Sequence, residues 1–342
     1  MQVTLMKTLL SGFIIAAFLL FPFYDAQLGA ASSPTKLIIT YAVFSEREGA
    51  LFVARDQGFF RKHGLDVQLV YVNTASVALS ALARGDSHLN TGSTSGAILG
   101  AMAGGLDLVF VAGLVNKLTG AFVTAPEIKS PMDLKGKTIG VTSIGGGNWV
   151  FTMLALEHWG LDPKRDGITI RVIGNEAVRA QAIATGVIDG AHVATYAFST
   201  ALKKQGYRIL ADLTDLGIPY QGTTVFSRRS LVDRSPETVE KVLTALVEAI
   251  AFIQEPANKA AAMRSLAKGL YLPRAEDAAE GYEIMKTLFE RRIYPNVQGI
   301  RNTIRLLGAT NEKIRALKAE DVIDDRVVKK LEQKGLFQVG PR

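Results

Sequence analysis

The chain carries one succession of elements twice, and this internal repeat restricts its fold more than any other feature. An apolar strand pattern at residues 36–40 leads through a polar loop to a helical pattern at 50–62 and then to an alternating strand pattern at 67–72. About 100 residues later, the segment 137–141 begins the same succession. Strands that alternate with helices predict βαβ units on a parallel sheet. Two copies therefore predict an α/β protein with two similar lobes.

The repeat extends through three units of each copy. In the first copy, a helical pattern ends near residue 84 and a short strand pattern follows at 88–91. In the second copy, the counterpart helix ends near residue 185 and the strand lies at 189–193. Each short strand leads to a small polar loop and a further helix. An order that matches over three units indicates a duplicated architecture.

The loops that follow the strands are the candidate binding segments, because ligands of parallel α/β sheets bind beyond the carboxyl ends of the strands. If the two lobes face each other, these loops line one cleft. They are 44–49, 73–76 and 92–95 in the first copy and 142–148, 175–177 and 194–196 in the second.

Hydroxyl, amide, basic and aromatic side chains of these loops and of neighbouring strand ends are the predicted ligand-binding groups, together with glycines at one helix start. We name as candidates Phe44, Ser45, Arg47, Asn73, Thr74, Ser93, Thr94, Ser95, Lys117, Ser143, Gly146, Gly147, Asn148, Trp149, Thr195, Tyr196 and Thr223.

The glycine-rich loop 143–148 lies between a strand and a helix, as phosphate-binding loops do. It lacks the Gly-Lys-Ser/Thr ending of a nucleotide P-loop, and its glycine spacing is not that of a dinucleotide fingerprint. We therefore expect exposed backbone amides at a helix N-terminus, which can hold a small anion or a polar head group. A turn without a ligand is the alternative.

For the other candidates, the alternative is a structural role without ligand contact. Arg47 can pair with a carboxylate or sulfonate through two parallel hydrogen bonds, but Glu46 and Glu48 beside it also fit a solvated, charged loop. The side chains of Trp149 and Tyr196 can stack on a flat ligand or pack within their lobe. The hydroxyl groups of 93–95 and Thr74 can cap helices, which is the commonest use of Ser and Thr at such positions.

Charge and cysteine content exclude several function classes. Lys and Arg number 39 and Asp and Glu 32, a net charge of +7, but the basic residues are scattered. This pattern does not predict nucleic-acid binding and is compatible with a small anionic ligand. The absence of cysteine excludes disulfides, thiol nucleophiles and iron–sulfur clusters.

Catalytic and metal-binding motifs are also missing from the sequence. His63, His88, His158 and His192 lie far apart, without the spacing of a metal site, and there is no Gly-x-Ser-x-Gly elbow. We expect no cofactor, no metal and no catalytic residue.

The first 31 residues have the layout of a secretory signal. A start with Lys7 precedes an apolar run at 9–23, and small residues lie before Ser32, where we expect cleavage. An uncleaved membrane anchor is the alternative, but the run is shorter than a membrane span. Because no cysteine follows the cut, we expect an exported chain without a lipid anchor. Beyond residue 235 the pattern is almost wholly helical, and we expect this extension to pack on the first lobe.

Several short motifs resemble those of periplasmic substrate-binding proteins of ABC importers. The group is that of nitrate, sulfonate and taurine, which also holds the Thi5-like binders of pyrimidine precursors. The resemblance covers about residues 36–336. The motifs are Ala-Arg-Asp-Gln-Gly-Phe-Phe at 54–60, His-Gly-Leu-Asp-Val at 63–67, Ala-Arg-Gly-Asp at 83–86, Asp-Leu-Lys-Gly-Lys-Thr-Ile-Gly-Val at 133–141 and Gly-Leu-Asp-Pro at 160–163.

The resemblance implies a type II periplasmic-binding fold, in which the chain crosses twice between two lobes. We place the crossings near Ala125 and Gly222, so that lobe 1 holds 32–125 and 222–342 and lobe 2 holds 126–221. The resemblance further implies a monomer in the periplasm whose lobes close on a small solute, which then passes to an inner-membrane permease and its ATPase. The expected ligand is a small anionic or polar organic molecule of the sulfonate, carboxylate, nitrate-like or pyrimidine-like kind.

Two other functions stay open for a chain of this family. One is an enzyme of the same fold that acts on a small pyrimidine or carboxylate metabolite, although Thi5-like enzymes use a cysteine-bearing motif and this chain has no cysteine. The other is a ligand-sensing input module. We expect a binding protein and not an enzyme.

Overall fold

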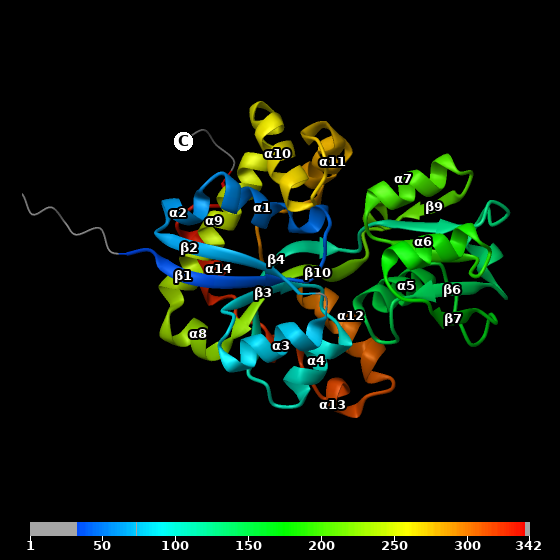
Figure 1. The fold of residues 1–342 in the computed structure, drawn as a ribbon. Coiled ribbons are helices and arrows are strands. Elements are labelled where there is room, and N and C mark those ends of the chain that lie inside the picture. The colour runs from blue at the N-terminus through cyan, green and yellow to red at the C-terminus, as the bar shows by residue number, and fades with distance from the viewer. Residues whose placement is uncertain (1–32, 73, 339–342) are drawn as a thin grey trace, which may run out of the picture. The chain divides into compact units, whose positions relative to one another are not determined.

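The fold contains two five-stranded sheets. This computed structural model describes residues 33–72 and 74–338. The predicted signal segment, 1–31, and the candidate Asn73 lie outside the described residues. The first sheet has the order β2-β1-β3-β10-β4 and the second β7-β6-β8-β5-β9 (Figure 1). The strands of the first sheet are β1 Thr35–Tyr41, β2 Leu65–Tyr71, β3 Leu89–Gly92, β4 Leu108–Lys117 and β10 Pro219–Arg228. Those of the second are β5 Ala121–Thr124, β6 Thr138–Val141, β7 Thr169–Val172, β8 Gly190–Val193 and β9 Arg208–Asp212.

The two sheets have the same strand order, which confirms the duplicated α/β architecture. In each, the first strand of the copy lies between the second and the third, and these three strands are parallel. The sheets are nevertheless mixed and not wholly parallel as the repeat predicts. In the first sheet β10 is antiparallel to β3 and β4, and in the second β5 is antiparallel to β8 and β9. The chain enters β5 from the first sheet and β10 from the second sheet. Each of these two strands therefore runs antiparallel to its neighbours.

The chain crosses between the sheets at 118–120 and again at 213–218, a few residues before Ala125 and Gly222. The division into domains at those two residues stays a prediction. The two crossings lie side by side, because the Leu118 amide donates to the Ile218 carbonyl (3.2 Å) and the Leu213 amide to the Gly120 carbonyl (2.8 Å). Gly120 has a φ of 84°, and a Cβ there would lie 2.5 Å from the Val193 carbonyl oxygen, so this position requires glycine.

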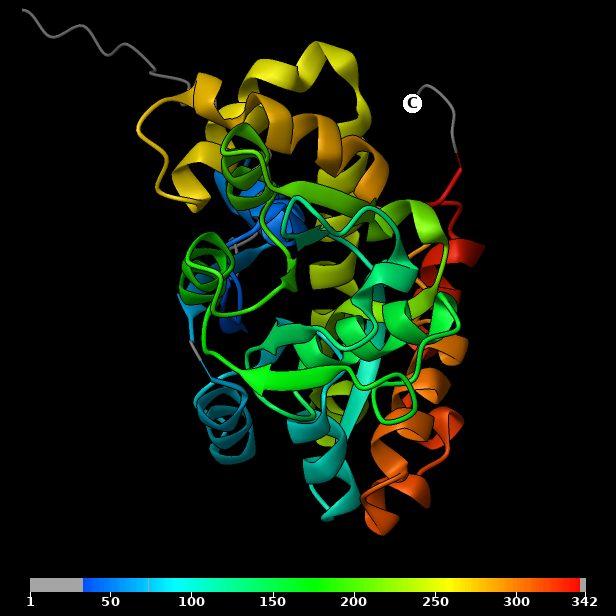
Figure 2. The same ribbon diagram turned by 90° about the vertical axis from the view of Figure 1, so that its right-hand side faces the viewer.

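Most helices surround the first sheet, and with it they form what we call the first lobe. They are α1 Gly49–Asp56, α2 Phe59–Lys62, α3 Ala75–Arg84, α4 Gly96–Ala103, α8 Arg229–Arg234, α9 Pro236–Gln254, α10 Lys259–Gly269, α11 Ala279–Leu288, α12 Val297–Gly308, α13 Glu312–Arg315 and α14 Arg326–Gln333. The second lobe is the second sheet with α5 Gly147–His158, α6 Glu176–Ala184 and α7 Tyr196–Lys204, drawn in green in Figure 2.

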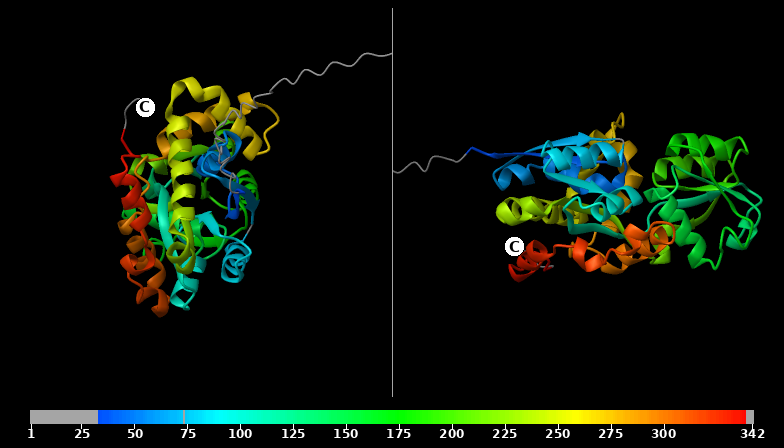
Figure 3. Two further views of the ribbon diagram at one scale, coloured as in Figure 1. Left: turned by 90° about the vertical axis from the view of Figure 1, so that its left-hand side faces the viewer. Right: turned by 90° about the horizontal axis from the view of Figure 1, so that it is seen from below.

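The C-terminal helices pack mainly on the first lobe. Helix α9 buries an apolar face against α1, where Leu246 and Ile250 share a core with Leu51 and Phe52. In the view from below, the yellow-to-red tail lies with the first sheet, and its orange part reaches the second lobe (Figure 3). None of the helices within the described segments has the length and apolarity needed to cross a bilayer.

A second apolar core extends from one lobe to the other near the crossings. It joins Leu99 of α4 and Phe151 of α5 to Tyr220 of β10 and Ile300 of α12, all buried. Gly299 permits this packing, because a Cβ added there would lie 2.6 Å from the Cα and C atoms of Tyr220. Helix α12 can therefore lie directly on the backbone of β10.

We predict that Gly299→Ala lowers the free energy of unfolding by about 1–3 kcal/mol, because the clash is with backbone that cannot move aside cheaply. Gly100→Ala is the matched control. Gly100 also lies in a helix, but a Cβ there would meet nothing within 4 Å. Since alanine favours helix over glycine, this variant should gain about 0.5–1 kcal/mol. Urea denaturation of both variants measures the difference, and an equal effect of the two would contradict the packing argument.

Candidate ligand-binding cleft

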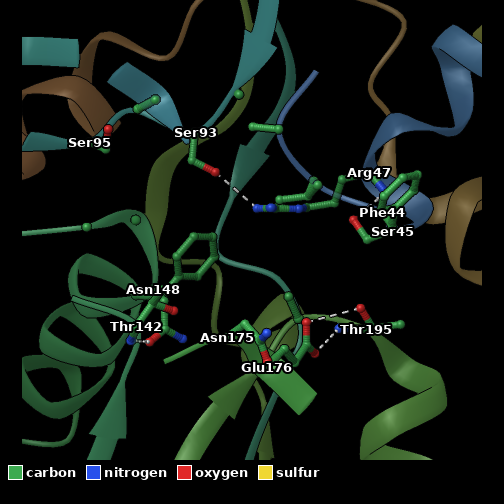
Figure 4. A pocket seen from close by; sticks show the side chains of 18 of the residues that line it. Phe44, Ser45, Arg47, Ser93, Ser95, Thr142, Asn148, Asn175, Glu176 and Thr195 are labelled. Carbon is green, nitrogen blue, oxygen red and sulfur yellow. Dashed lines mark hydrogen bonds between the residues drawn. The ribbon is translucent and has the colours of Figure 1, made fainter. Parts of the chain in front are cut away.

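A cavity of about 510 Å³ lies between the two lobes, and the loops at the strand ends of both lobes line it. In Figure 4, Phe44, Arg47 and Ser93 of the first lobe lie on one side, and Asn148 and Glu176 of the second lobe lie on the other. The volume is within the range of about 300–1,000 Å³ that is usual for small-molecule sites. The cavity is thus the candidate ligand-binding cleft.

More than half of the predicted ligand-binding residues line this cavity. That they bind a ligand stays a prediction, but the structure brings them together from four loops far apart in the sequence. They are Phe44, Ser45, Arg47, Ser93, Ser95, Ser143, Gly146, Gly147, Asn148 and Thr195.

Two predicted residues use their hydroxyl groups inside the protein and do not line the cavity. Thr74 is the N-cap of α3, where its Oγ1 accepts a hydrogen bond from the Val77 amide (3.3 Å). The Tyr196 hydroxyl is bonded to the Asp212 carboxylate (3.0 Å) and to Thr214 Oγ1 (3.0 Å). These bonds tie α7 to the end of β9, and Tyr196 is not among the residues that line the cavity.

Four further candidates also lie outside the cavity lining. The Trp149 ring packs on the apolar core that the lobes share. Thr94 is buried, and its carbonyl accepts the Tyr220 hydroxyl (2.5 Å). Lys117 ends β4 at the first crossing, and Thr223 is buried within β10. Being at a strand end therefore did not suffice for these residues to reach the cleft.

Arg47 is a buried cation that faces the cleft, and the residues that the structure describes give its guanidinium no paired carboxylate. The 3-10 helix η1 (Glu46–Glu48) carries it, and the Ser45 side chain accepts from the Arg47 amide (3.4 Å). Its Nη1 donates to Ser93 Oγ (3.1 Å), and its guanidinium lies 5.7 Å from the Phe151 ring centre. Nε has no partner, and among the described residues no carboxylate oxygen lies within 4 Å of the guanidinium.

The charged loop alternative is wrong, because all three residues of η1 are buried. Glu46, Arg47 and Glu48 are only 5%, 7% and 1% exposed. Glu48 accepts a hydrogen bond from Thr91 Oγ1 (2.7 Å). Burial raises the pKa of Glu46 and of Glu48 to about 7 in each case. Near neutral pH these carboxyl groups are only partly ionised and therefore compensate the Arg47 charge only in part.

On the second lobe, His192 is a neutral, fixed part of the cleft wall. Its Nε2 donates to the Thr119 carbonyl (2.7 Å), and its Nδ1 accepts from Asn148 Nδ2 (2.9 Å). This pairing follows because a carbonyl can only accept. The ring stacks on Phe151 at 4.6 Å, and burial lowers the pKa of His192 to about 3.

Arg179 holds the loops of the second lobe in place. Its Nη1 donates to Thr142 Oγ1 (2.6 Å) and to the Gly174 carbonyl (2.7 Å), and its Nη2 donates to the His192 carbonyl (3.3 Å). Burial lowers the pKa of Arg179. These bonds connect the loops after β6 and β7 to strand β8, and thereby fix the wall that faces Arg47.

The sequence analysis missed several lining residues. Arg179, His192 and Phe151 lie inside elements and not in loops, so their side chains reach the cleft only through tertiary packing. Asn175 and Glu176 lie in a loop that we expected to line the cleft, but we did not name them. The available signal for Arg179 was its position one helical turn after Asn175, on the same face of α6.

In the described part of the chain, His, Asp and Glu form no group of three or more that could hold a metal ion.

A family model matches this chain, and several known structures share its fold. A family model described as NMT1/THI5-like matches residues 47–260. The periplasmic aliphatic sulphonate binding protein SsuA from Escherichia coli is similar in structure, with 22% identity and a TM-score of 0.68 over 86% of this chain and 93% of that one. The periplasmic nitrate-binding protein NrtA from Synechocystis PCC 6803 has 13% identity and a TM-score of 0.68 over 90% and 92%.

A third similar structure is the alkanesulfonate-binding protein SsuA from Xanthomonas axonopodis pv. citri. It has 21% identity and a TM-score of 0.61 over 87% of this chain and 98% of that one. These likenesses confirm the predicted periplasmic-binding-protein fold. A search of curated proteins finds no match.

We predict that stability falls as pH rises from about 4.5 to about 7. In this window the unfolded Glu48 carboxyl is ionised, whereas the folded one, with its pKa raised to about 7, keeps its proton. The folded state therefore binds more protons, so raising the pH favours unfolding. The contribution is at most about 3 kcal/mol at the high end of the window.

Urea denaturation at pH 5 and pH 8 tests this on Glu48→Gln, which keeps an acceptor for Thr91 but does not titrate. Between pH 5 and pH 8, the free energy of unfolding of the variant should fall less than that of the parent. Glu127→Gln, at an exposed position of the second lobe, is the control and should follow the parent. A parent and a Glu48→Gln variant with the same pH dependence would show that this group does not titrate in the window.

Proposed function

The chain belongs to the NMT1/THI5-like family, and on this basis we propose its function. In this proposal it acts as the solute-binding component of an ABC import system. The observation that carries this proposal is Arg47, a buried guanidinium without a carboxylate partner among the described residues, in a cavity lined by both lobes. The names of the similar sulfonate-binding and nitrate-binding proteins support the same function.

The ligand that fits this site is a small organic anion. A carboxylate or sulfonate can take two parallel hydrogen bonds from the Arg47 guanidinium, and its charge offsets the cost of burying that cation. The rest of the cavity suits an organic body, because Phe44, Tyr71, Phe151 and Phe198 line it, and the rings of Phe44 and Tyr71 lie 4.1 Å apart. An inorganic anion such as nitrate would leave most of the 510 Å³ to water against apolar walls.

Ligand binding favours a closed arrangement of the lobes. A ligand that contacts both walls stabilises the closed state by the difference between its affinities for the two states. Contacts between the lobes are present on several sides of the cleft. The Gly96 amide donates to the Gly145 carbonyl (3.0 Å), and Thr200 Oγ1 donates to Glu280 Oε1 (2.9 Å). The adjacent crossings at 118–120 and 213–218 act as the hinge.

The same proposal assigns the partners and the location. The closed, loaded form delivers its solute to an inner-membrane permease and its ATPase. The chain works in the periplasm as a monomer, after removal of residues 1–31. Catalysis is not part of the proposal, since both ring nitrogens of His192 are engaged and the carboxyl groups with a pKa near 7, on Glu46 and Glu48, do not line the cavity.

A thermal-unfolding screen tests this function. The mature protein is mixed with organic sulfonates, organic carboxylates, nitrate and pyrimidines, and the change in Tm is recorded. We expect organic anions to stabilise, by about 2.7 kcal/mol at 100 times the dissociation constant. A screen in which no anion raises Tm, or in which a compound is chemically converted, would contradict solute capture.

Arg47 should dominate the affinity for such an anion. We predict that Arg47→Gln weakens binding by at least about tenfold, because it removes a buried, charge-assisted contact. The affinity of Arg47→Lys should lie between those of the parent and of Arg47→Gln, because lysine keeps the charge but not the planar pair of donors. The control is Arg234→Gln at an exposed site of the first lobe. Calorimetric titration measures all four proteins, and equal affinities of Arg47→Gln and the control would contradict the assignment.

A further inference from the structure

An aromatic ring of the second lobe lies against the buried cation of the first. The Cζ atom of Arg47 is 5.7 Å from the centre of the Phe151 ring, which helix α5 carries. Both side chains are buried, and both line the cavity. Within about 6 Å, the negative face of an aromatic ring attracts a cation, and it does so more strongly where water is excluded. The pair therefore has the distance and the shielding of a cation–π contact.

Few hydrogen bonds hold the Arg47 guanidinium. Its Nη1 donates to Ser93 Oγ (3.1 Å), as Figure 4 shows, whereas its Nε has no partner in the described part of the chain. Ser93 is itself fixed, because its Oγ donates to the Gly222 carbonyl (2.6 Å). One hydrogen bond anchors one end of a planar group but lets the group turn about that bond. A ring beside the guanidinium restricts this turn.

The Phe151 ring is held in place by two other rings. The His192 ring stacks on it at a centroid distance of 4.6 Å and an interplanar angle of 11°. The Tyr220 ring meets it at 4.6 Å and 63°, and the Tyr220 hydroxyl donates to the Thr94 carbonyl (2.5 Å). Both ring nitrogens of His192 are hydrogen-bonded. The ring beside Arg47 is thus part of a fixed aromatic cluster.

The absence of a charge on His192 suits this arrangement. Burial lowers the pKa of His192 to about 3, and the charges of Arg179 and Arg47 contribute to this lowering. The imidazole ring that stacks on Phe151 is therefore neutral near neutral pH. A charged imidazole would place a second cation on the ring that Arg47 already contacts.

We propose that Phe151 is a positioning residue for anion capture: its ring holds the Arg47 guanidinium in the orientation in which that group receives the oxyanion of a ligand. This inference rests on the proposed function. Phe151 belongs to the apolar core that joins the two lobes, so we expect it to stay against Arg47 when the cleft opens. The cation is then in place before a ligand arrives, and binding does not have to order its side chain.

Fluorinated rings test this role with little change in packing. Fluorine withdraws electron density from the face of the ring and so weakens its attraction for a cation. Phe151 is replaced in the whole mature protein with mono-, di- and trifluorinated phenylalanine, and calorimetric titration measures the affinity for butanesulfonate and for pentanoate. We expect the affinity for both anions to fall with each added fluorine, by at least about threefold for the trifluorinated ring.

Two controls separate positioning from packing. Phe122 is buried in the same apolar core, with its ring edge-on to Trp159 at 5.2 Å, and no cation of the described residues lies over it. Trifluorination at Phe122 should leave the affinity at the parent value. In an Arg47→Gln background, trifluorination at Phe151 should not change the affinity further, because the cation is gone. A merely structural role of the ring would produce the same loss in both backgrounds.

Urea denaturation without any ligand tests the contact itself. Trifluorination at Phe151 should lower the urea midpoint more in the parent than in Arg47→Gln, since only the parent loses an attraction between ring and cation. Equal shifts of the midpoint in the two backgrounds would overturn the inferred contact. Tm values show that each protein is folded.

The outcomes distinguish this inference from the function on which it rests. Affinities that do not change with fluorination at Phe151 would overturn the role of this ring and leave anion capture standing. An equal loss of affinity in the parent and in Arg47→Gln would also overturn it. If the parent binds neither anion, the proposed function is contradicted, and the positioning role with it.

Discussion

Each sheet holds one strand that arrives from the other lobe, and the rest of the structure depends on this exchange. Strand β5 follows β4 in the chain but is hydrogen-bonded between β8 and β9, and β10 follows β9 but lies between β3 and β4. Neither sheet can be completed without the other lobe. The exchange also explains why the ends of the parallel strands in both lobes open toward one space, where ten or more loop residues meet around the cavity.

The chemistry of this cavity follows from how little its charges are paired. Within the described segments, the buried Arg47 side chain has one hydrogen-bonded partner, Ser93, and its Nε has none. Burial raises the pKa of the glutamates on either side of it to about 7. The opposite wall is held by Arg179 and by a neutral His192, whose hydrogen bonds go to the protein itself. Only Glu176 brings a carboxylate to the lining that the structure describes. A low-dielectric site in which a buried guanidinium has no carboxylate partner discriminates among ligands by charge position as well as by size.

The sequence was sufficient for the repeat, for most elements to within a few residues and for the loops of the cleft, because periodicity and strand-to-helix order are local signals. It did not show the strand exchange, since β5 and β10 look like any other apolar strand. It also did not show that Glu46, Arg47 and Glu48 are buried. A charged tripeptide is usually solvated, and this one is buried by tertiary contacts with helix α11, Thr91 and Phe151. Thr74 and Tyr196 have the residue types of ligand contacts, but their hydroxyl groups are bonded within the protein. Arg179 and His192 reach the cleft from inside an element, which no loop pattern indicates.

The apolar core that joins Phe151, Tyr220 and Ile300 has a consequence for the energetics of opening. This core includes residues of the crossings, among them Leu118 and Leu213, so we expect a rotation about the crossings to keep most of its contacts. We then expect few buried atoms to become exposed on opening, and only a small free-energy gap between the empty open and empty closed forms. With such a gap, even a solute that binds with moderate strength can convert a mostly open population into a mostly closed one.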